Sequence, residues 1–250
     1  MDSIYFFLYV NEFALSIPYC LSTASFIDSF DISGQDIIPQ GIAFSRGVGA
    51  TGEGETGPPA GTKMLIVGQT GNDVSEYTLS TAWDVSTATF VSGVCDLTDD
   101  SSGITKPRAI DFNSDGTKMR VIASNTDDVH EFTLTTGFDM STCDYTDGAD
   151  LSVGGKDGNP RGMAFSSDGT KLFFVGKTND KVHEYTLSTA YDVSTAAYVD
   201  ALDISSHEAN SSGLTFDKNG YRMYIVGQDG IEINEYYLST AWDISTASHK

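Results

Sequence analysis

The chain has 250 residues, which is enough for a large buried core in one or two domains. Its apolar content and its many Tyr and Phe residues are typical of a globular protein and exclude a disordered chain. Acidic residues outnumber basic ones by 35 to 14, for a net charge of −21. Such a surface repels phosphate backbones and anionic lipid, so we expect neither nucleic-acid binding nor membrane insertion.

The N-terminal part predicts two strands. Residues 1–25 look like a degenerate partial repeat or an N-terminal extension, and their apolar run Ile4–Val10 predicts a strand. No basic segment precedes this run, so we recognise no signal peptide. Residues 9–16 resemble the third strand of a truncated unit, and residues 26–33 resemble a fourth strand without a first or second before it.

The phrase LSTAWDVSTATF at 79–90 recurs along the chain and defines a repeat. Its leading leucines are Leu15, Leu79, Leu134, Leu187 and Leu238, separated by 64, 55, 53 and 51 residues. A period near fifty residues is typical of a propeller or a solenoid. A full unit contains four short runs rich in Val, Ile, Phe, Tyr and Thr, separated by turn sequences such as SDGT. Four antiparallel strands per unit, repeated radially, predict an all-β fold, a β-propeller.

The repeat predicts about four blades in a single domain over 26–250. The units span 39–98, 107–152, 160–205 and 212–249. The last unit stops before its fourth strand, so we expect the N-terminal strand 26–33 to complete that blade and close the ring. The strand at 9–16 is then left over. It could pack on the outside, pair with another chain to form a homo-oligomer, or belong to a larger ring shared by two chains.

The sequence NPRGMAFSSDGTKLFFVG at 159–176, followed by KVHEYTL at 181–187, resembles YVTN-like and NHL-like β-propeller repeats. The LSTAWDVSTA variant looks like a repeat from surface-associated and phage-associated proteins of marine microbes. This resemblance implies a propeller fold for nearly the whole chain, whereas propellers serve as enzymes, lectins and scaffolds alike.

Several motifs have weak functional interpretations. The Gly-rich insertion at 46–60 contains a GxGxxG pattern, but acids and prolines follow it where a nucleotide site needs a helix. The acidic turns Asn72-Asp73, Asp99-Asp100 and Asp127-Asp128 could bind calcium, although turn formation is the simpler interpretation. We otherwise expect no cofactor. The cysteines Cys20, Cys95 and Cys143 suggest neither a metal site nor a disulfide framework.

Repeated polar positions favour structural roles. A glutamate occurs in every third strand, and in four units a basic residue precedes it by thirteen positions, which predicts cross-strand ion pairs. His130 and His183 share one repeat position, and no third ligand suggests a metal site. The fifth residue of the repeated phrase is aromatic in all five copies. We expect these rings to pack on the ends of their blades, with stacking on sugars as the alternative.

The strongest functional candidates lie where the repeats differ, just before each inner strand. These are Gln40, Arg108, Arg161 and Ser212, and nearby loops contribute Asp36 and Asp157. Two arginines directed at one channel mouth could hold an acidic or sugar ligand. The alternative is charge balance with Asp36, Asp99, Asp100, Asp157 and Glu208.

No catalytic constellation is recognisable in the sequence, so we expect no enzymatic activity. We expect a binding or display module on an extracellular or virion surface, with a glycan or a protein as its partner. The alternatives are a propeller hydrolase or lyase with its site at the channel mouth, and a purely structural capsid or fibre decoration.

Overall fold

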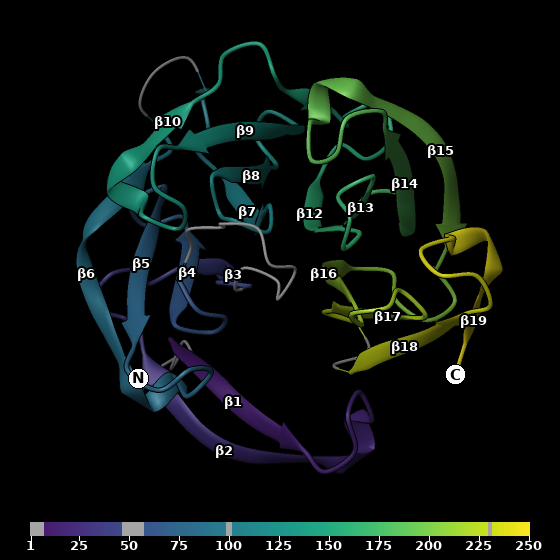
Figure 1. The fold of residues 1–250 in the computed structure, drawn as a ribbon. Helices are drawn as coiled ribbons and strands as arrows, with labels where there is room; N and C mark the ends of the chain where they lie inside the picture. The colour runs from purple at the N-terminus through teal and green to yellow at the C-terminus, as the bar shows by residue number, and fades with distance from the viewer. Residues whose placement is uncertain (1–7, 47–57, 99–101, 230–231) are drawn as a thin grey trace, which may run out of the picture.

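The computed structural model describes residues 8–46, 58–98, 102–229 and 232–250. It confirms the all-β fold, with four antiparallel sheets arranged around a central axis as the blades of a propeller (Figure 1). Strands β3, β7, β12 and β16 lie innermost, and β6, β10, β15 and β19 lie at the rim (Figure 1). No helix in the described part of the chain is long and apolar enough to cross a membrane.

Each blade runs from the inside outwards in chain order, and consecutive strands pair with each other except at the broken outer strand of blade 2. Blade 1 contains β3 (Pro39–Phe44), β4 (Lys63–Gly68), β5 (Asp73–Leu79) and β6 (Ala88–Asp96). Blade 2 contains β7 (Pro107–Phe112), β8 (Lys118–Ala123), β9 (Asp128–Leu134) and a broken outer strand, β10 (Cys143–Tyr145) and β11 (Leu151–Ser152). Blade 3 contains β12 (Pro160–Phe165), β13 (Lys171–Gly176), β14 (Lys181–Leu187) and β15 (Ala196–Asp203). Blade 4 contains β16 (Ser211–Phe216), β17 (Arg222–Gly227), β18 (Ile233–Leu238) and β19 (Ala247–His249).

The N-terminal strands pair with each other, which corrects the expected ring closure. Strand β2 (Ala24–Asp31) pairs along its length with β1 (Tyr9–Leu15), and the last blade is completed by its own β19, which pairs with β18. Strand 9–16 is therefore not left over. The hairpin β1–β2 occupies its own sector of the ring, between blade 4 and blade 1 (Figure 1).

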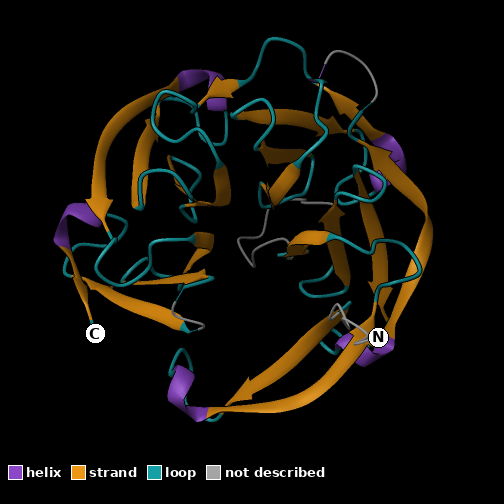
Figure 2. Cartoon of the chain, turned by 180° about the vertical axis from the view of Figure 1, so that it is seen from behind, coloured by secondary structure: helices purple, strands orange, loops and turns teal. Residues whose placement is uncertain are grey.

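The repeated phrase forms the connection between the third and fourth strands of each blade, as its phase predicts. It contains a short 3₁₀ helix: η1 (Leu21–Thr23), η2 (Val85–Thr87), η4 (Met140–Thr142), η5 (Val193–Thr195) or η6 (Ile244–Thr246) (Figure 2). In blade 1, Asp84 caps η2 by accepting hydrogen bonds from the Ser86 backbone N–H at 3.1 Å and the Ser86 hydroxyl at 2.6 Å. An aspartate caps the turn in the same way in the other three complete blades, whereas Cys20 at the equivalent position of η1 makes no side-chain cap bond. The phrase is written five times because the turn occurs five times.

The aromatic residue of the phrase packs on its own blade in all four complete blades. Tyr191 adopts a left-handed backbone conformation with φ 59°. Its ring covers Gly169 in the turn between the first two strands, and lies 5.6 Å from the ring of Phe165. Trp83, Phe138 and Trp242 repeat this arrangement over Gly61, Gly116 and Gly220. Packing, the interpretation favoured from the sequence, is confirmed for these four rings.

The predicted ion pairs between second and third strands are also confirmed. Glu184 and Lys171 lie 2.7 Å apart in blade 3. The other pairs are Lys63–Glu76, Lys118–Glu131 and Arg222–Glu235. All four glutamates are buried. A repeated, buried and paired carboxylate is a structural element of the blade.

The same polar groups also connect neighbouring sectors, which sequence analysis did not predict. The second oxygen of Glu76 accepts a hydrogen bond from the Met140 backbone N–H of blade 2 at 3.0 Å, and Glu184 binds Ile244 of blade 4 in the same way at 3.3 Å. Between blades 2 and 3 the connection is made by Arg120, which is fully buried and donates to the Tyr191 carbonyl. Each blade thereby supports the phrase of the next.

A disulfide joins Cys95 of β6 to Cys143 of β10, with a Cα–Cα distance of 5.8 Å. It bridges the outer strands of blades 1 and 2 across 48 residues of sequence. The cysteine spacing alone could not reveal it, because the two residues become neighbours only when the blades stack. Cys20 is a free thiol.

Candidate binding site at the channel mouth

The four variable positions predicted from the sequence coincide with a β-bulge in every inner strand. The strand pairing skips one residue between Pro107 and Ala109, and that residue is Arg108. The same irregularity falls at Gln40, Arg161 and Ser212. A bulge removes one residue from the ladder and redirects its side chain, and bulges are frequent beside functional sites. Repeated backbone geometry with different side chains is the pattern expected of a specificity-determining position.

The inner strands approach one another closely at the axis, which brings neighbouring bulges together. A Cβ added at Gly162 would lie 2.8 Å from Gly213 of the next blade, so only glycine permits this packing. On the other side of the ring, the Arg108 guanidinium donates to the Gln40 side-chain oxygen of blade 1 at 2.7 Å. Gln40 and Arg108 are therefore in direct contact across two blades.

The two arginines carry positive charge and have no salt-bridge partner among the described residues. Arg108 also donates from Nε to the Ser124 hydroxyl at 2.7 Å, and Arg161 donates from Nε to Asn159 at 2.9 Å. Neither forms a salt bridge within the described part of the chain, and the terminal nitrogens of Arg161 have no partner there. Hydrogen-bond donors that are left free on a cation suit an anionic acceptor.

Burial and mutual proximity shape the charge of this site. Burial, followed by the neighbouring Arg161 guanidinium, lowers the pKa of Arg108 to about 10. Burial also lowers the pKa of Arg161, an effect partly offset by Asp157. Both arginines remain charged at neutral pH. A bound anion would relieve their repulsion, so the electrostatics favour a negatively charged ligand.

The predicted acids Asp36 and Asp157 lie beneath the loops that carry these side chains. Asp157 is buried and accepts backbone N–H bonds from Asn159 at 2.8 Å, Thr178 at 3.0 Å and Asn179 at 2.9 Å. Asp36 holds Ile38 and Thr70 in the corresponding loops of blade 1. Both acids tie the loop before the inner strand to the loop after the second strand. These hydrogen bonds hold the loops around the channel mouth in place, so both acids have a structural role there.

Blade 4 contributes hydroxyls instead of an arginine. The side-chain oxygens of Ser211 and Ser212 are buried and have no hydrogen-bond partner in the described residues. An unpaired buried hydroxyl is unfavourable unless water or a ligand binds it. Blade 4 thus differs from blades 2 and 3, which place a cationic donor at this position.

Other sequence motifs lie elsewhere or outside the described residues. The GxGxxG pattern at 47–52 and the Asp99-Asp100 pair are outside them. Asn72 and Asp127 adopt left-handed conformations in tight turns, with φ 52° and 58°. No group of three or more His, Cys, Asp or Glu side chains suited to a metal occurs in the described part of the chain.

Comparisons with known proteins show the fold and leave the function open. No family model and no curated protein matches the chain. A protein from Lactobacillus plantarum superposes with a TM-score of 0.52 at 12% identity, over 91% of this chain and 60% of that one. A protein from Bacteroides uniformis described as a candidate 6-phosphogluconolactonase gives 0.52 at 14% identity, over 95% and 62%. A nidogen/laminin complex gives 0.51 at 14% identity, over 86% and 64%. The chain thus spans about 60% of the length of the first two structures.

Proposed function

We propose that the chain is a non-catalytic propeller module that binds an acidic glycan at the channel mouth, on an extracellular or virion surface. The observation that carries this proposal is the pair Arg108 and Arg161, which are half-buried on bulged inner strands and form no salt bridge with any described residue, in a chain of net charge −21. Gln40, whose side-chain oxygen accepts from Arg108, adds a polar group that suits sugar hydroxyls.

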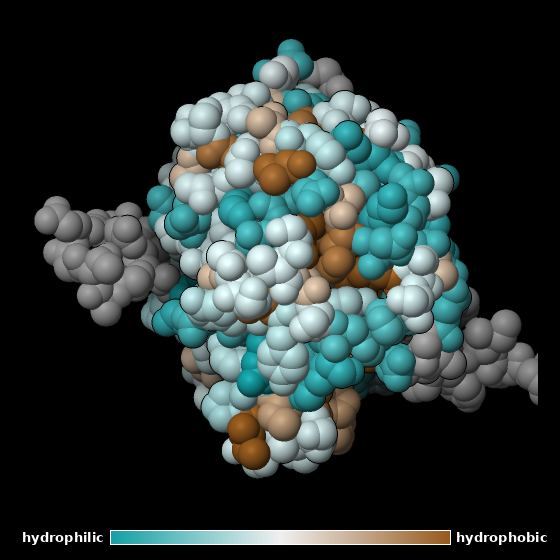
Figure 3. Space-filling view, turned by 90° about the vertical axis from the view of Figure 1, so that its right-hand side faces the viewer, coloured by the Kyte–Doolittle hydropathy of each residue, from teal (hydrophilic) through white to brown (hydrophobic). Residues whose placement is uncertain are grey.

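The surroundings of the site support a display role. Outer strands present a mostly hydrophilic surface with scattered apolar residues, as the side of blades 3 and 4 illustrates (Figure 3). The Cys95–Cys143 disulfide supports an oxidising location, since such bonds persist mainly in secreted and surface proteins.

A glycan array probed with the intact protein tests the proposal. We expect binding to carboxylated, sulfated or phosphorylated glycans over neutral ones. Arg108→Ala and Arg161→Ala should each weaken that binding about tenfold or more, as expected for a lost charge-assisted contact. Lys218→Ala is the matched control, because Lys218 is an exposed cation in the turn between the first two strands of blade 4.

Three outcomes would refute the proposal. Binding that survives both arginine substitutions would place the site elsewhere. Conversion of the bound compound to a product would identify an enzyme. Binding of proteins alone would identify a protein-recognition module.

A further inference from the structure

The hairpin β1–β2 occupies the position of the two outer strands of a fifth blade. Blade 4 contacts the copy of the repeated phrase in this hairpin. Arg222 and the Tyr224 hydroxyl both donate to the Tyr19 carbonyl at 2.9 Å. Lys171 makes the same contact with the Trp242 carbonyl at 2.6 Å. On its other side, Glu12 accepts from the Val85 backbone N–H of blade 1 at 3.0 Å. This contact matches the one between Glu76 and Met140.

The inner edge of β1 has no partner strand in the described part of the chain. The equivalent strands β5, β9, β14 and β18 each pair on both sides, whereas β1 pairs only with β2. In blade 3, the Leu187 N–H donates to the Thr170 carbonyl at 2.8 Å and the Tyr191 N–H to the Gly169 carbonyl at 2.8 Å. No corresponding bond exists for Leu15 or Tyr19 within the described residues. An unpaired edge is a template for an additional strand.

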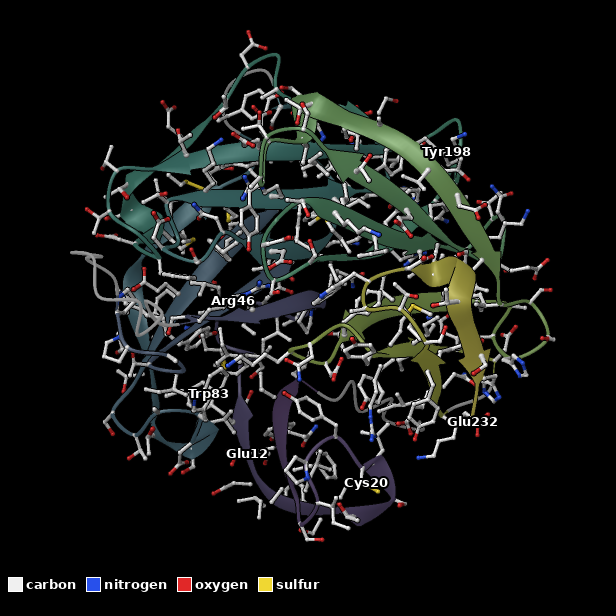
Figure 4. The ribbon with its side chains drawn as sticks, turned by 45° about the vertical axis from the view of Figure 1, so that its right-hand side comes forward. Glu12, Cys20, Arg46, Trp83, Tyr198 and Glu232 are labelled. Atoms are coloured by element: carbon white, nitrogen blue, oxygen red, sulfur yellow. A yellow bond between two sulfur atoms is a disulfide. The ribbon has the colours of Figure 1, made fainter. Side chains whose placement is uncertain are left out.

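A cavity of about 670 Å³ lies along this edge, between the hairpin and the inner strands of blade 1. Its lining includes Phe13 from β1, Ile42 from β3 and Trp83. Phe13 is 57% exposed, whereas Tyr77 at the same repeat position is fully buried. Figure 4 labels Glu12 on the hairpin and Trp83 on the adjacent blade 1. Cys20 lies at the opposite end of the hairpin, on the side of blade 4.

Among the described residues, Glu12 lacks the cation that the four equivalent glutamates have. Glu76, Glu131, Glu184 and Glu235 each pair with a Lys or Arg from the second strand of their own blade. Glu12 makes its bond to Val85 and has no salt bridge in the described chain. The site is therefore complementary to a strand that carries a basic residue at its start.

We propose that the inner edge of β1 binds a β-hairpin whose sequence follows the first two strands of this repeat. That hairpin would pair with β1, place a lysine or arginine against Glu12, place a glycine turn under Tyr19 and bury Phe13. The four complete blades show this fit four times over. A second copy of this chain suits the site less well, because the hairpins of this type that the structure describes are already paired within blades.

A labelled peptide with the sequence of residues 160–176 tests the proposal against the full chain. We expect saturable binding by fluorescence anisotropy, and slower hydrogen exchange confined mainly to the amides of residues 9–15. Glu12→Gln should weaken binding about tenfold, as should Lys171→Glu within the peptide, since each removes one charge-assisted contact. Asp28→Asn is the matched control, because Asp28 is an exposed carboxylate on β2 opposite Glu12 in register.

The proposal is overturned if a scrambled peptide binds equally well, or if protection appears elsewhere than in β1. It is also overturned if the protein dimerises through β1 in sedimentation experiments without peptide, which would make a second copy the occupant. Phe13→Ser provides a second test of the same surface if Glu12→Gln proves unstable in circular dichroism. Glycan binding at the channel mouth is measured separately, so either proposal can fail alone.

Discussion

Removing the carboxylate of Glu184 tests whether the repeated glutamate holds the ring together. This side chain is buried, accepts from Lys171 at 2.7 Å and accepts from the Ile244 N–H of the next blade at 3.3 Å. Glu184→Ala leaves a buried N–H unsatisfied, which costs about 1–3 kcal/mol. It also removes the partner of Lys171, whose side chain is 26% exposed, so solvent and the Trp242 carbonyl compensate in part.

We therefore expect Glu184→Ala to lower the free energy of unfolding by roughly 3 kcal/mol, or the melting temperature by roughly 6–12 °C. Glu184→Gln keeps an acceptor for Ile244 and should cost about 1 kcal/mol. Urea titration followed by circular dichroism measures both variants. Glu232→Ala, an exposed glutamate in blade 4, should change stability by less than about 0.5 kcal/mol. Equal losses for Ala and Gln would show that the contact with Ile244 contributes nothing.

Three further predictions concern covalent, conformational and protonation features of the blades. Removing the Cys95–Cys143 disulfide, which closes a loop of 48 residues, should lower the free energy of unfolding by about 4 kcal/mol. Urea titration of the double variant Cys95→Ala/Cys143→Ala tests this, and an unchanged unfolding midpoint would contradict it. Gly169→Ala should lower the free energy of unfolding by about 2 kcal/mol or more, because Gly169 has φ 71° and an added Cβ would lie 2.2 Å from the Tyr191 ring. Gly158→Ala is the control and should be nearly neutral, because an added Cβ there meets open space. Burial lowers the pKa of His183 to about 4 from 6.5, so the folded chain does not take up the proton that the unfolded chain binds. Stability should then fall by roughly 2–3 kcal/mol between pH 6.5 and 4, and melting curves of His183→Asn should lack this part of the loss.

Much of the fold is predictable from the sequence because the repeat marks equivalent positions. The period near fifty residues predicts the blades, and the thirteen-residue spacing predicts the Lys171–Glu184 type of ion pair. Both features are local to one blade, where chain separation and strand register limit the geometry. The capped turn at Asp84 is local in the same sense.

Contacts between blades were not predictable in this way. The sequence does not show that Cys95 and Cys143 face each other, nor that Glu184 reaches the next blade. The expected pairing of 26–33 with the last blade was wrong because a strand-like pattern does not specify its partner. Residues 24–31 follow 9–15 through a short connection, and a local hairpin forms more readily than a closure across the whole chain. His249 and its neighbours then supply the short outer strand of blade 4.

The positions that repeat make structural contacts, whereas the positions that vary carry the proposed recognition. The repeated glutamates, turn glycines and aromatic rings are all occupied by contacts within the ring, so substitution there should affect stability first. The bulged positions keep one backbone geometry while their side chains change from Gln40 to Arg108, Arg161 and Ser212. The hairpin β1–β2 differs from the complete blades. Its residues Glu12, Phe13 and Tyr19 occupy repeated positions, but the described chain provides no inner strand pair beside them as it does in the other blades. On our proposal, the residues that stabilise a complete blade become binding residues in this hairpin, so the same repeat yields both a ring and an acceptor for a further strand pair.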